Sequence, residues 1–340
     1  MPPLSSPARP RASASATLLA ALAIAIVAGA CTPIRAAARP DATEPCPPGP
    51  SALVVVIDGA RFSETLGDPA RAHITQTWQR VAATGAWSDS FYNDGLTETI
   101  PGHSAILTGT WQPIANDGFR RPTRPTLFEY FRAHTGLPAQ CAVVVGGKGK
   151  LAALAYSTSS GYGPALAAEA DTADRSDRAT WDALRARLDT TRPRLVLLSL
   201  SDVDRRGHAN DWPGYLAALQ TADGIVGELW DYALATEPYR GRAALIVTND
   251  HGRSATDLAV HTGDENSRRI MLVAAGPGVD PTGRIDGRRT QIELAASIGA
   301  LLGIPTPEAA GAAMPWARPI GPGAWTVSRL PLVVAAASSR

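Results

Sequence analysis

The chain has 340 residues, of which 45% are hydrophobic, and this is enough to build one large α/β core without a second domain of comparable size. The net charge is only +1, and the sequence contains neither blocks of basic residues nor aromatic residues interleaved with basic ones. A surface for binding a nucleic-acid polymer is therefore not expected. A pocket for a small anionic substrate remains compatible with this composition, because such a pocket needs only a few local cations.

The first forty residues have the features of a secretory leader. They contain no acidic residue, and Arg9 and Arg11 precede an apolar run over residues 17–30 that ends in small residues. A positive start, a short apolar segment and a small-residue exit are typical of a signal peptide. The run is short for a membrane-spanning helix, which needs about 20 residues, although an anchored N-terminal helix is the alternative interpretation. Residues 1–31 are therefore predicted to be a signal peptide or a lipoprotein signal.

The end of the leader bears on the location of the protein. Residues 28–31, Ala-Gly-Ala-Cys, resemble a bacterial lipoprotein cleavage box, except that its first position is usually a larger aliphatic residue. Either Cys31 carries a lipid or the leader is cleaved nearby without one. Both alternatives predict an exported protein, periplasmic or lipid-anchored to the bacterial envelope, with a lipid on Cys31 as its only contact with a membrane. Residues 32–50 are rich in Ala and Pro and are typical of a semi-extended tether.

The two remaining cysteines, Cys46 and Cys141, each precede an apolar run that we interpret as a strand. If these strands neighbour each other in a parallel sheet, both thiols lie at the same end and within reach of a disulfide. An oxidising compartment would permit that bond. Two unlinked thiols are the alternative, because the sequence does not fix the distance between the two Cα atoms.

Beyond the tether, strand-like and helix-like segments alternate along the chain. Continuous apolar runs, typical of strands covered on both faces, occur at 53–57, 142–145, 194–200, 243–248 and 270–275. Helix-like segments lie at 73–84, 126–135, 177–189, 213–232 and 290–302. This alternation predicts an α/β fold with a doubly wound, mostly parallel sheet and helices on both faces. The catalytic domain is expected to span residues 51–305, and residues 306–340 to form a C-terminal tail that packs on the domain or trails from it.

Acidic and imidazole side chains follow three of the predicted strands, at the edge where open parallel sheets bind ligands. Asp58 follows the first strand, Asp204 and His208 follow the 194–200 strand, and Asp250 and His251 follow the 243–248 strand. Taken singly, Asp58 is explained by a turn and the 204–208 segment by a solvated loop. An acid directly beside an imidazole after a buried run is harder to explain as a turn. Together these side chains supply the mixture of ligands expected for zinc or a similar divalent ion.

A candidate nucleophile lies in residues 97–109. Pro101 is well tolerated in a first helical turn, and residues 104–107 can continue the helix. Thr99 would then lie at the helix N-terminus, where free N–H groups and the helix dipole favour an anionic phosphoryl group. An ordinary threonine N-cap is the alternative. Because a threonine hydroxyl is a weak nucleophile until a metal lowers its pKa, this role depends on the metal ligands.

The order of these motifs resembles that of the alkaline phosphatase superfamily over roughly residues 51–305. The chain looks most like the nucleotide pyrophosphatase/phosphodiesterase branch, and it also resembles the compact threonine-type alkaline phosphatases and phosphonoacetate hydrolase. The matching residues, in chain order, are Asp58, Thr99 before Pro101, Asp204 with Gly207 and His208, Asp250-His251-Gly252 and His261-Thr262-Gly263.

The resemblance implies two divalent metal ions, with Zn²⁺ as the expected metal. Such ions lie about 3.5–4 Å apart in hydrolytic sites. The resemblance also implies attack by Thr99 and a phospho-threonine intermediate. We interpret His103 as a residue that supports the site or packs in the core, and not as a metal ligand. One ion would be held by Asp204, His208 and His261, and the other by Asp58, Asp250 and His251 with the Thr99 oxygen as a further ligand.

Three further residues are candidates for contacts with the phosphoryl group. Asn116 lies near where the superfamily often places an asparagine, with Asn93 as the alternative. Lys148 and Lys150 follow the 142–145 strand at the ligand-binding edge, where ammonium groups can neutralise phosphoryl oxygens. A solvated basic turn is the alternative. The lysine pair resembles the Lys-x-Arg pair of the threonine-type phosphomonoesterases and the Lys-x-Lys pair of phosphonoacetate hydrolase, which favours a doubly charged head group.

The sequence therefore predicts a metal-dependent hydrolase that cleaves a small-molecule phosphate monoester or phosphonate through Thr99. A type I phosphodiesterase/nucleotide pyrophosphatase is the first alternative, and a catalytically silent binding lipoprotein of the same fold is the second. A sulfatase is disfavoured, because residues 99–103 contain neither the oxidisable Cys or Ser nor the arginine of that branch. The sequence specifies neither the natural substrate nor the oligomeric state.

Overall fold

The computed structural model of the chain describes residues 44–321. The predicted leader with Cys31, most of the predicted tether and the last 19 residues lie outside this range. Within it, no helix combines the length and the apolar character needed to cross a membrane.

A sheet of nine strands forms the centre of the described residues, in the order β4-β3-β5-β1-β6-β7-β2-β8, with β9 paired to β2. Strands β4, β3, β5, β1 and β6 run parallel to one another, whereas β7 is antiparallel to both β6 and β2. The predicted α/β fold with a mostly parallel sheet is thus confirmed. The strands are β1 (Ser51–Ile57), β2 (Ala86–Tyr92), β3 (Ala142–Gly146), β4 (Glu169–Thr172), β5 (Leu195–Leu200), β6 (Ala243–Thr248), β7 (Arg269–Ala275), β8 (Gly283–Arg284) and β9 (Arg289–Thr290).

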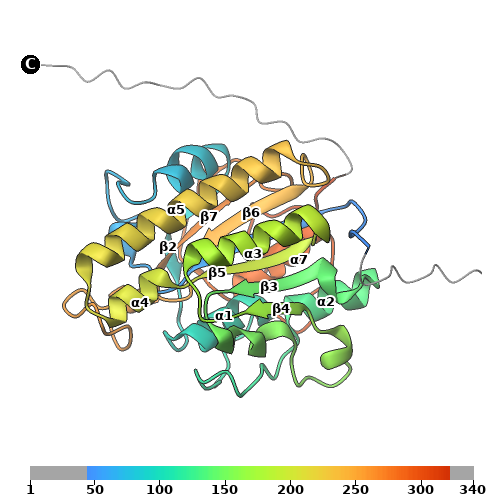
Figure 1. Cartoon of the computed structure of the whole chain (residues 1–340), viewed down its shortest axis with the longest axis horizontal. Helices are drawn as coiled ribbons and strands as arrows, with labels where there is room; N and C mark the ends of the chain where they lie inside the picture. Colours follow the sequence, from blue (N-terminus) through green and yellow to red (C-terminus); the bar gives the residue numbers. More distant parts are fainter. Residues whose placement is uncertain (1–43, 322–340) are drawn as a thin grey trace, which may run out of the picture. The chain divides into compact units, whose positions relative to one another are not determined.

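Helices cover both faces of this sheet, and alternate residues of each buried strand contact the two layers. In β1, Leu53, Val55 and Ile57 belong to the same core as α3 and α5, whereas Val54 and Val56 belong to the core that contains α1, α2 and α7. Figure 1 shows α3 and α5 crossing the near face of the sheet. The helices are α1 (Thr99–Thr108), α2 (Leu127–Thr135), α3 (Asp177–Thr190), α4 (Asp202–His208), α5 (Trp212–Ala235), α6 (Glu265–Arg268) and α7 (Glu293–Leu302).

The segment predicted as a helix at 73–84 is helical from residue 75 to residue 84. It is not a regular α-helix, because it forms a π-helix at Thr77–Val81 followed by a 3₁₀ turn at Ala82–Thr84. Its start is held by Asp223 of α5, whose carboxylate accepts hydrogen bonds from the backbone N–H groups of Gln76 and Thr77 at 2.7 and 2.8 Å. Because this contact joins residues about 146 positions apart, the local sequence pattern does not reveal it.

A disulfide joins Cys46 and Cys141, with their Cα atoms 5.7 Å apart. The strands that follow the two cysteines, β1 and β3, are not neighbours, because β5 lies between them. The bond forms because the segment before β1 crosses the start of β5, where the N–H of Cys46 donates to the carbonyl of Thr191. The last part of the predicted tether is thus packed on the domain, as is the start of the predicted tail, where Trp316 is buried and Ile320 N–H donates to Leu301 O.

Candidate active site and metal centre

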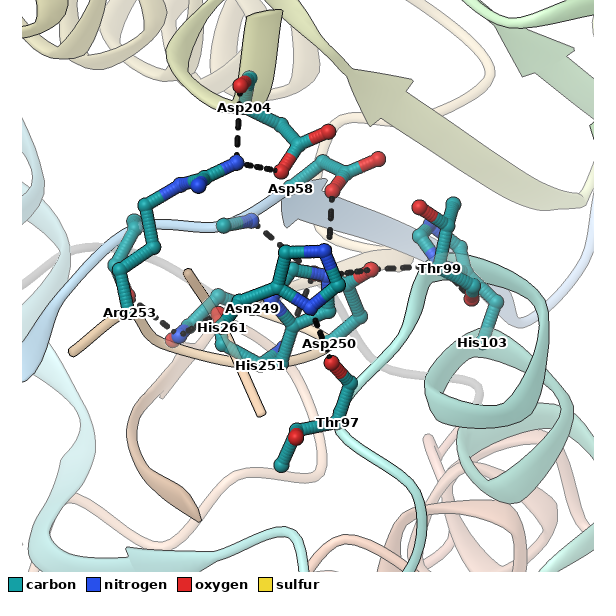
Figure 2. A network of polar contacts seen from close by, with 12 residues as sticks. Asp58, Thr97, Thr99, His103, Asp204, Asn249, Asp250, His251, Arg253 and His261 are labelled. Atoms are coloured by element: carbon teal, nitrogen blue, oxygen red, sulfur yellow. Dashed lines mark hydrogen bonds and ion pairs between the residues drawn. The ribbon is translucent and has the colours of Figure 1, made fainter. Parts of the chain in front are cut away.

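The predicted metal ligands converge at one edge of the sheet. Strands β5, β1 and β6 are parallel neighbours, so their carboxyl ends lie side by side. Asp58 directly follows β1, Asp204 lies in α4 just after β5, and Asp250 and His251 follow β6. In Figure 2 these side chains and His261 point toward one another from their separate elements.

Asp58, Asp250 and His251 form a fully buried group of potential metal ligands. One ligand atom of each lies within 4.8 Å of the others, and His251 Nε2 is 3.6 Å from Asp58 Oδ1 and 3.5 Å from Asp250 Oδ2. In the described part of the chain, Asp58 Oδ1 and His251 Nε2 have no hydrogen-bond partner, and Asp250 Oδ2 has only the contact with His103 Nδ1 at 3.2 Å. Buried polar atoms without a partner are rare in proteins. Two carboxylate oxygens and an imidazole nitrogen fit a divalent cation.

Neighbouring groups orient the same three side chains. The N–H groups of Gly59 and His251 donate to Asp250 Oδ1, which leaves Oδ2 facing the group. His251 Nδ1 donates to the carbonyl of Gly252, which leaves its Nε2 directed at Asp58 and Asp250. Burial, reinforced by the charge of Asp250, raises the pKa of Asp58. Burial alone would also raise the pKa of Asp250, but the positive charges of His251 and His103 lower it.

A second group combines Asp204, His251 and His261, whose ligand atoms also lie within 4.8 Å of one another. His261 Nδ1 donates to the carbonyl of Thr97 at 2.5 Å, which turns its Nε2 toward the site. Burial and the charge of His251 lower the pKa of His261 to about 4, so its imidazole is neutral near pH 7. His208 lies at the rim: it is 51% exposed, and its Nε2 is 3.4 Å from Asp204 Oδ2. His208 is thus adjacent to this group, which includes His251 in addition to Asp204 and His261.

Thr99 is the first residue of α1 and is 3% exposed. The N-cap of the helix is Glu98, so Thr99 is not the N-cap that formed the alternative interpretation. Its hydroxyl oxygen accepts a hydrogen bond from Lys148 Nζ at 3.1 Å. His103, one turn along α1, donates from Nδ1 to Thr99 O at 2.8 Å and lies 3.2 Å from Asp250 Oδ2. His103 therefore connects the helix to the buried group of potential metal ligands, as expected of a supporting residue.

The candidate phosphoryl contacts gather at the same end of α1. Asn116 Oδ1 accepts from the Ile100 N–H at 2.9 Å and from Lys150 Nζ at 2.8 Å. The N–H of Ile100 is thus bonded to this amide, where the sequence predicted free N–H groups. The alternative, Asn93, is fully buried, and its side-chain amide already bonds the backbone: it donates to Asp250 O and accepts from Gly95 N–H.

The chain was compared with known proteins. A family model described as type I phosphodiesterase/nucleotide pyrophosphatase matches residues 111–299, more than half of the sequence. The chain belongs to this family. The matched residues include both lysines and all of the proposed metal ligands except Asp58 and Thr99, and this family lies within the alkaline phosphatase superfamily that the motifs predicted.

Among curated proteins, phosphopentomutase from Methylobacterium nodulans is 32% identical over 118 residues, which cover 33% of this chain and 25% of that protein. The similarity thus spans only about a quarter of this relative. Among solved structures, phosphonate monoester hydrolase from Silicibacter pomeroyi aligns with a TM-score of 0.60 and 13% identity, covering 78% of this chain and 76% of that one. Lipoteichoic acid synthase LtaP from Listeria monocytogenes gives 0.57 and 13%, covering 76% and 73%. These two structures share the fold of this family member.

The site of this family member contains one residue that the sequence analysis missed. The guanidinium of Arg253 is fully buried, donates to Leu258 O at 2.7 Å and to Asp204 O at 2.8 Å, and forms an ion pair with Asp204 Oδ1. Figure 2 shows it reaching across the site to Asp204. Its position directly after the Asp250-His251-Gly252 motif was the available signal, because a basic residue following a buried strand needs a partner.

Arg253 and Lys148 together hold Asp204 as an anion. Burial would raise the pKa of the Asp204 carboxyl, but the hydrogen bond to His208 and the charges of Lys148 and Arg253 keep it well below its usual range. The ammonium of Lys148 bonds Asp204 Oδ2 at 2.5 Å, while Arg253 occupies Oδ1. Both oxygens of this carboxylate therefore have cationic partners.

Proposed function

We propose that this chain is a metal-dependent hydrolase of small phosphoric esters in which Thr99 is the nucleophile. The observation that carries the proposal is the buried Thr99 hydroxyl at the start of α1, bonded to Lys148 beside a carboxylate oxygen of Asp58 and an imidazole nitrogen of His251 that have no hydrogen-bond partner within residues 44–321. Two divalent ions, with Zn²⁺ as the expected metal, would when bound supply Lewis acidity and lower the pKa of the nucleophile. The residues placed to hold them are Asp58, Asp250, His251, Asp204 and His261, with His208 at the rim.

The surrounding residues have separate tasks in this proposal. Lys148 Nζ positions the Thr99 hydroxyl, and its own pKa is raised by Asp58 and Asp204 against the effect of burial, so it stays positively charged. Lys150 and Asn116 lie together at the N-terminus of α1. Two ammonium groups beside the nucleophile favour a head group with two negative charges. We therefore favour a phosphate monoester or a phosphonate as the substrate.

A phosphodiesterase is the second candidate, and two observations favour it. The family model that matches the chain is that of type I phosphodiesterases and nucleotide pyrophosphatases. The loop that supplies Asn116 also lines a cavity of about 610 Å³, bounded by Ile114, Phe119, Arg120 and Arg121 among others. Such a cavity has room for the second ester group of a diester.

Turnover of matched aryl substrates tests the proposal. Purified protein loaded with Zn²⁺ is assayed on aryl phosphate monoesters, diesters, phosphonates and sulfates. We expect the monoester or the phosphonate to be hydrolysed with the highest kcat/KM; a clear preference for the diester would favour the second candidate. Absence of turnover on every ester, with metal bound, would favour a binding protein of the same fold.

The nucleophile is tested by the variants Thr99→Ala and Thr99→Ser. Alanine should lower kcat by roughly a thousandfold or more, because it removes the attacking oxygen, while bound metal measured by elemental analysis stays largely intact. Serine keeps the hydroxyl and should recover part of the activity. Unchanged turnover in Thr99→Ala would reject Thr99 as the nucleophile.

We further propose that the protein is exported and acts in the periplasm or on the bacterial envelope. The leader-like composition of residues 1–31 supports this location. The Cys46–Cys141 disulfide also supports it, because such bonds persist in oxidising compartments. Fractionation of cells that express the full chain, with and without Cys31→Ala, would separate a lipid-anchored from a freely periplasmic form.

A further inference from the structure

The two lysines of the site are the only lysines in the 340-residue sequence, and every other fixed positive side chain is an arginine. The ammonium of Lys148 lies 2.6 Å from Asp58 Oδ2, 2.5 Å from Asp204 Oδ2 and 3.1 Å from Thr99 Oγ1. A compact ammonium can bond three oxygens that converge in this way, whereas a planar guanidinium requires a wider arrangement. Lys148 is only 13% exposed, so these contacts are made largely without water.

The two groups of metal ligands differ in their existing partners. In the first group, Asp58 Oδ1 and His251 Nε2 have no hydrogen-bond partner among the described residues, although Asp58 Oδ2 bonds Lys148 at 2.6 Å and Asp250 Oδ2 lies 3.2 Å from His103 Nδ1. In the second group the only carboxylate is Asp204, and both of its oxygens already pair with cations, Oδ1 with Arg253 and Oδ2 with Lys148. A cation entering the second group must therefore displace or share a partner of its only carboxylate, whereas the first group keeps one unpaired carboxylate oxygen and one unpaired imidazole nitrogen.

We propose that the two metal sites bind with unequal affinity, because Lys148 competes with the second ion for Asp204 Oδ2. This inference rests on the proposed two-ion site and adds an order of filling to it. The Asp58–Asp250–His251 site fills first. The second ion binds to Asp204 and His261 only as the ammonium of Lys148 moves off Asp204. The flexible four-carbon stem of lysine permits that movement, and the displaced ammonium stays beside Thr99, where a phosphoryl group would arrive.

Calorimetric titration of chelator-treated protein with Zn²⁺ tests the proposal without using turnover. Wild type should show one tight and one weaker site. Lys148→Met should tighten the weaker site by about tenfold or more, because it removes the competing charge from Asp204. Lys150→Met is the matched control, since it removes the same charge two residues away, where the contacts of Nζ are with Asn116. It should change the weaker site much less.

Two further measurements protect the test against misfolding of the methionine variant. Lys148→Arg keeps a positive charge near Asp204 without the compact fit of the ammonium, so its second site should stay weaker than that of Lys148→Met. Wild-type protein grown with isotope-labelled lysine gives only two lysine side-chain signals in NMR spectra. The signal that is missing in Lys148→Arg belongs to Lys148, and it should move mainly with the second equivalent of Zn²⁺. Two equal sites in wild type, equal effects of Lys148→Met and Lys150→Met, or a Lys148 signal that ignores the second equivalent would overturn the competition. Because Thr99 is tested by turnover, the proposed reaction can fail while the order of filling survives.

Discussion

At the scale of single residues, Arg253 supports the proposed site indirectly, by holding Asp204 in place. Its guanidinium is buried and holds both the carboxylate and the backbone carbonyl of Asp204. Arg253→Met should lower the free energy of unfolding by about 3–5 kcal/mol, because it leaves Asp204 Oδ1 and two buried carbonyls without their partner, although Lys148 still pairs with Asp204 Oδ2. Denaturant unfolding in the presence of chelator measures this loss.

The control for that variant is Arg206→Met, in the helix α4 that also contains Asp204. Arg206 pairs with Asp211 at 3.1 Å but is 57% exposed, and an exposed pair contributes at most about 1 kcal/mol. Arg206→Met should therefore lower the free energy of unfolding only slightly. Equal effects of the two variants would mean that Arg253 contributes no more than a surface ion pair.

At this scale the positions of the proposed metal ligands were predictable from the sequence, and their cationic partners were not. Asp58, Asp250 and His251 follow strands whose apolar runs are evident in the sequence, and parallel strands bring their carboxyl ends to one edge. The contact of Lys148 with Asp58 and the contact of Arg253 with Asp204 depend on side-chain packing between segments 90 and 49 residues apart. No local pattern records such contacts.

At the scale of elements, α4 contains a glycine whose missing side chain makes room for Arg253. In most helices Gly→Ala is stabilising by about 1 kcal/mol. A Cβ on Gly207 would lie 2.2 Å from Arg253 Nε, and the Arg253 guanidinium is held in place by three partner atoms. Gly207→Ala is therefore expected to destabilise the protein, with the sign reversed from the usual one.

A double-mutant cycle checks this explanation by denaturant unfolding. In the Arg253→Met background the flexible methionine can yield, so Gly207→Ala should become much less harmful than in wild type. Additive effects of the two substitutions would contradict the packing argument, because the clash requires both side chains.

The turn between β5 and α4 is held by Asp177 of α3, whose Oδ1 accepts from the N–H groups of Ser201 and Asp202. Burial and the charge of Asp202 raise the pKa of Asp177 to about 7. The unfolded chain ionises this carboxyl near pH 4, so wild-type stability falls between pH 4 and pH 7 as only the unfolded state gives up the proton. Asp177→Asn should gain about 1 kcal/mol or more over wild type across that range. Unfolding curves from pH 4 to 8 measure this, and a difference that stays constant with pH would contradict it.

The elements themselves were only partly evident from the sequence. The buried parallel strands and the long amphipathic helices α3 and α5 match their predicted ranges closely, because their apolar patterns are continuous. Strand β2 (Ala86–Tyr92) was not predicted. Two serines and an aspartate interrupt its apolar residues, so it has no continuous apolar run, and it pairs antiparallel with β7. Helix α4 was also not predicted, because seven residues with a glycine near their end and several charges resemble a polar loop.

At the scale of the whole molecule, the disulfide and the proposed site lie at opposite edges of the sheet. Cys46 and Cys141 precede β1 and β3, whereas Asp58 follows the last residue of β1. A strand of seven residues separates the two edges by roughly 20 Å. Stability and catalysis should therefore respond to this disulfide independently.

The double variant Cys46→Ser/Cys141→Ser tests that separation. The bond closes a segment with a sequence separation of 95, and removing it should lower the free energy of unfolding by about 4 kcal/mol, mainly by freeing the unfolded chain. Under native conditions kcat/KM on the best ester should stay close to that of wild type, because β1 and the Asp250 segment keep their positions through the sheet. Reductant should shift the unfolding midpoint of wild type but not of the variant. A large loss of kcat/KM in folded variant protein would show that the amino edge of the sheet controls the geometry of the carboxyl edge.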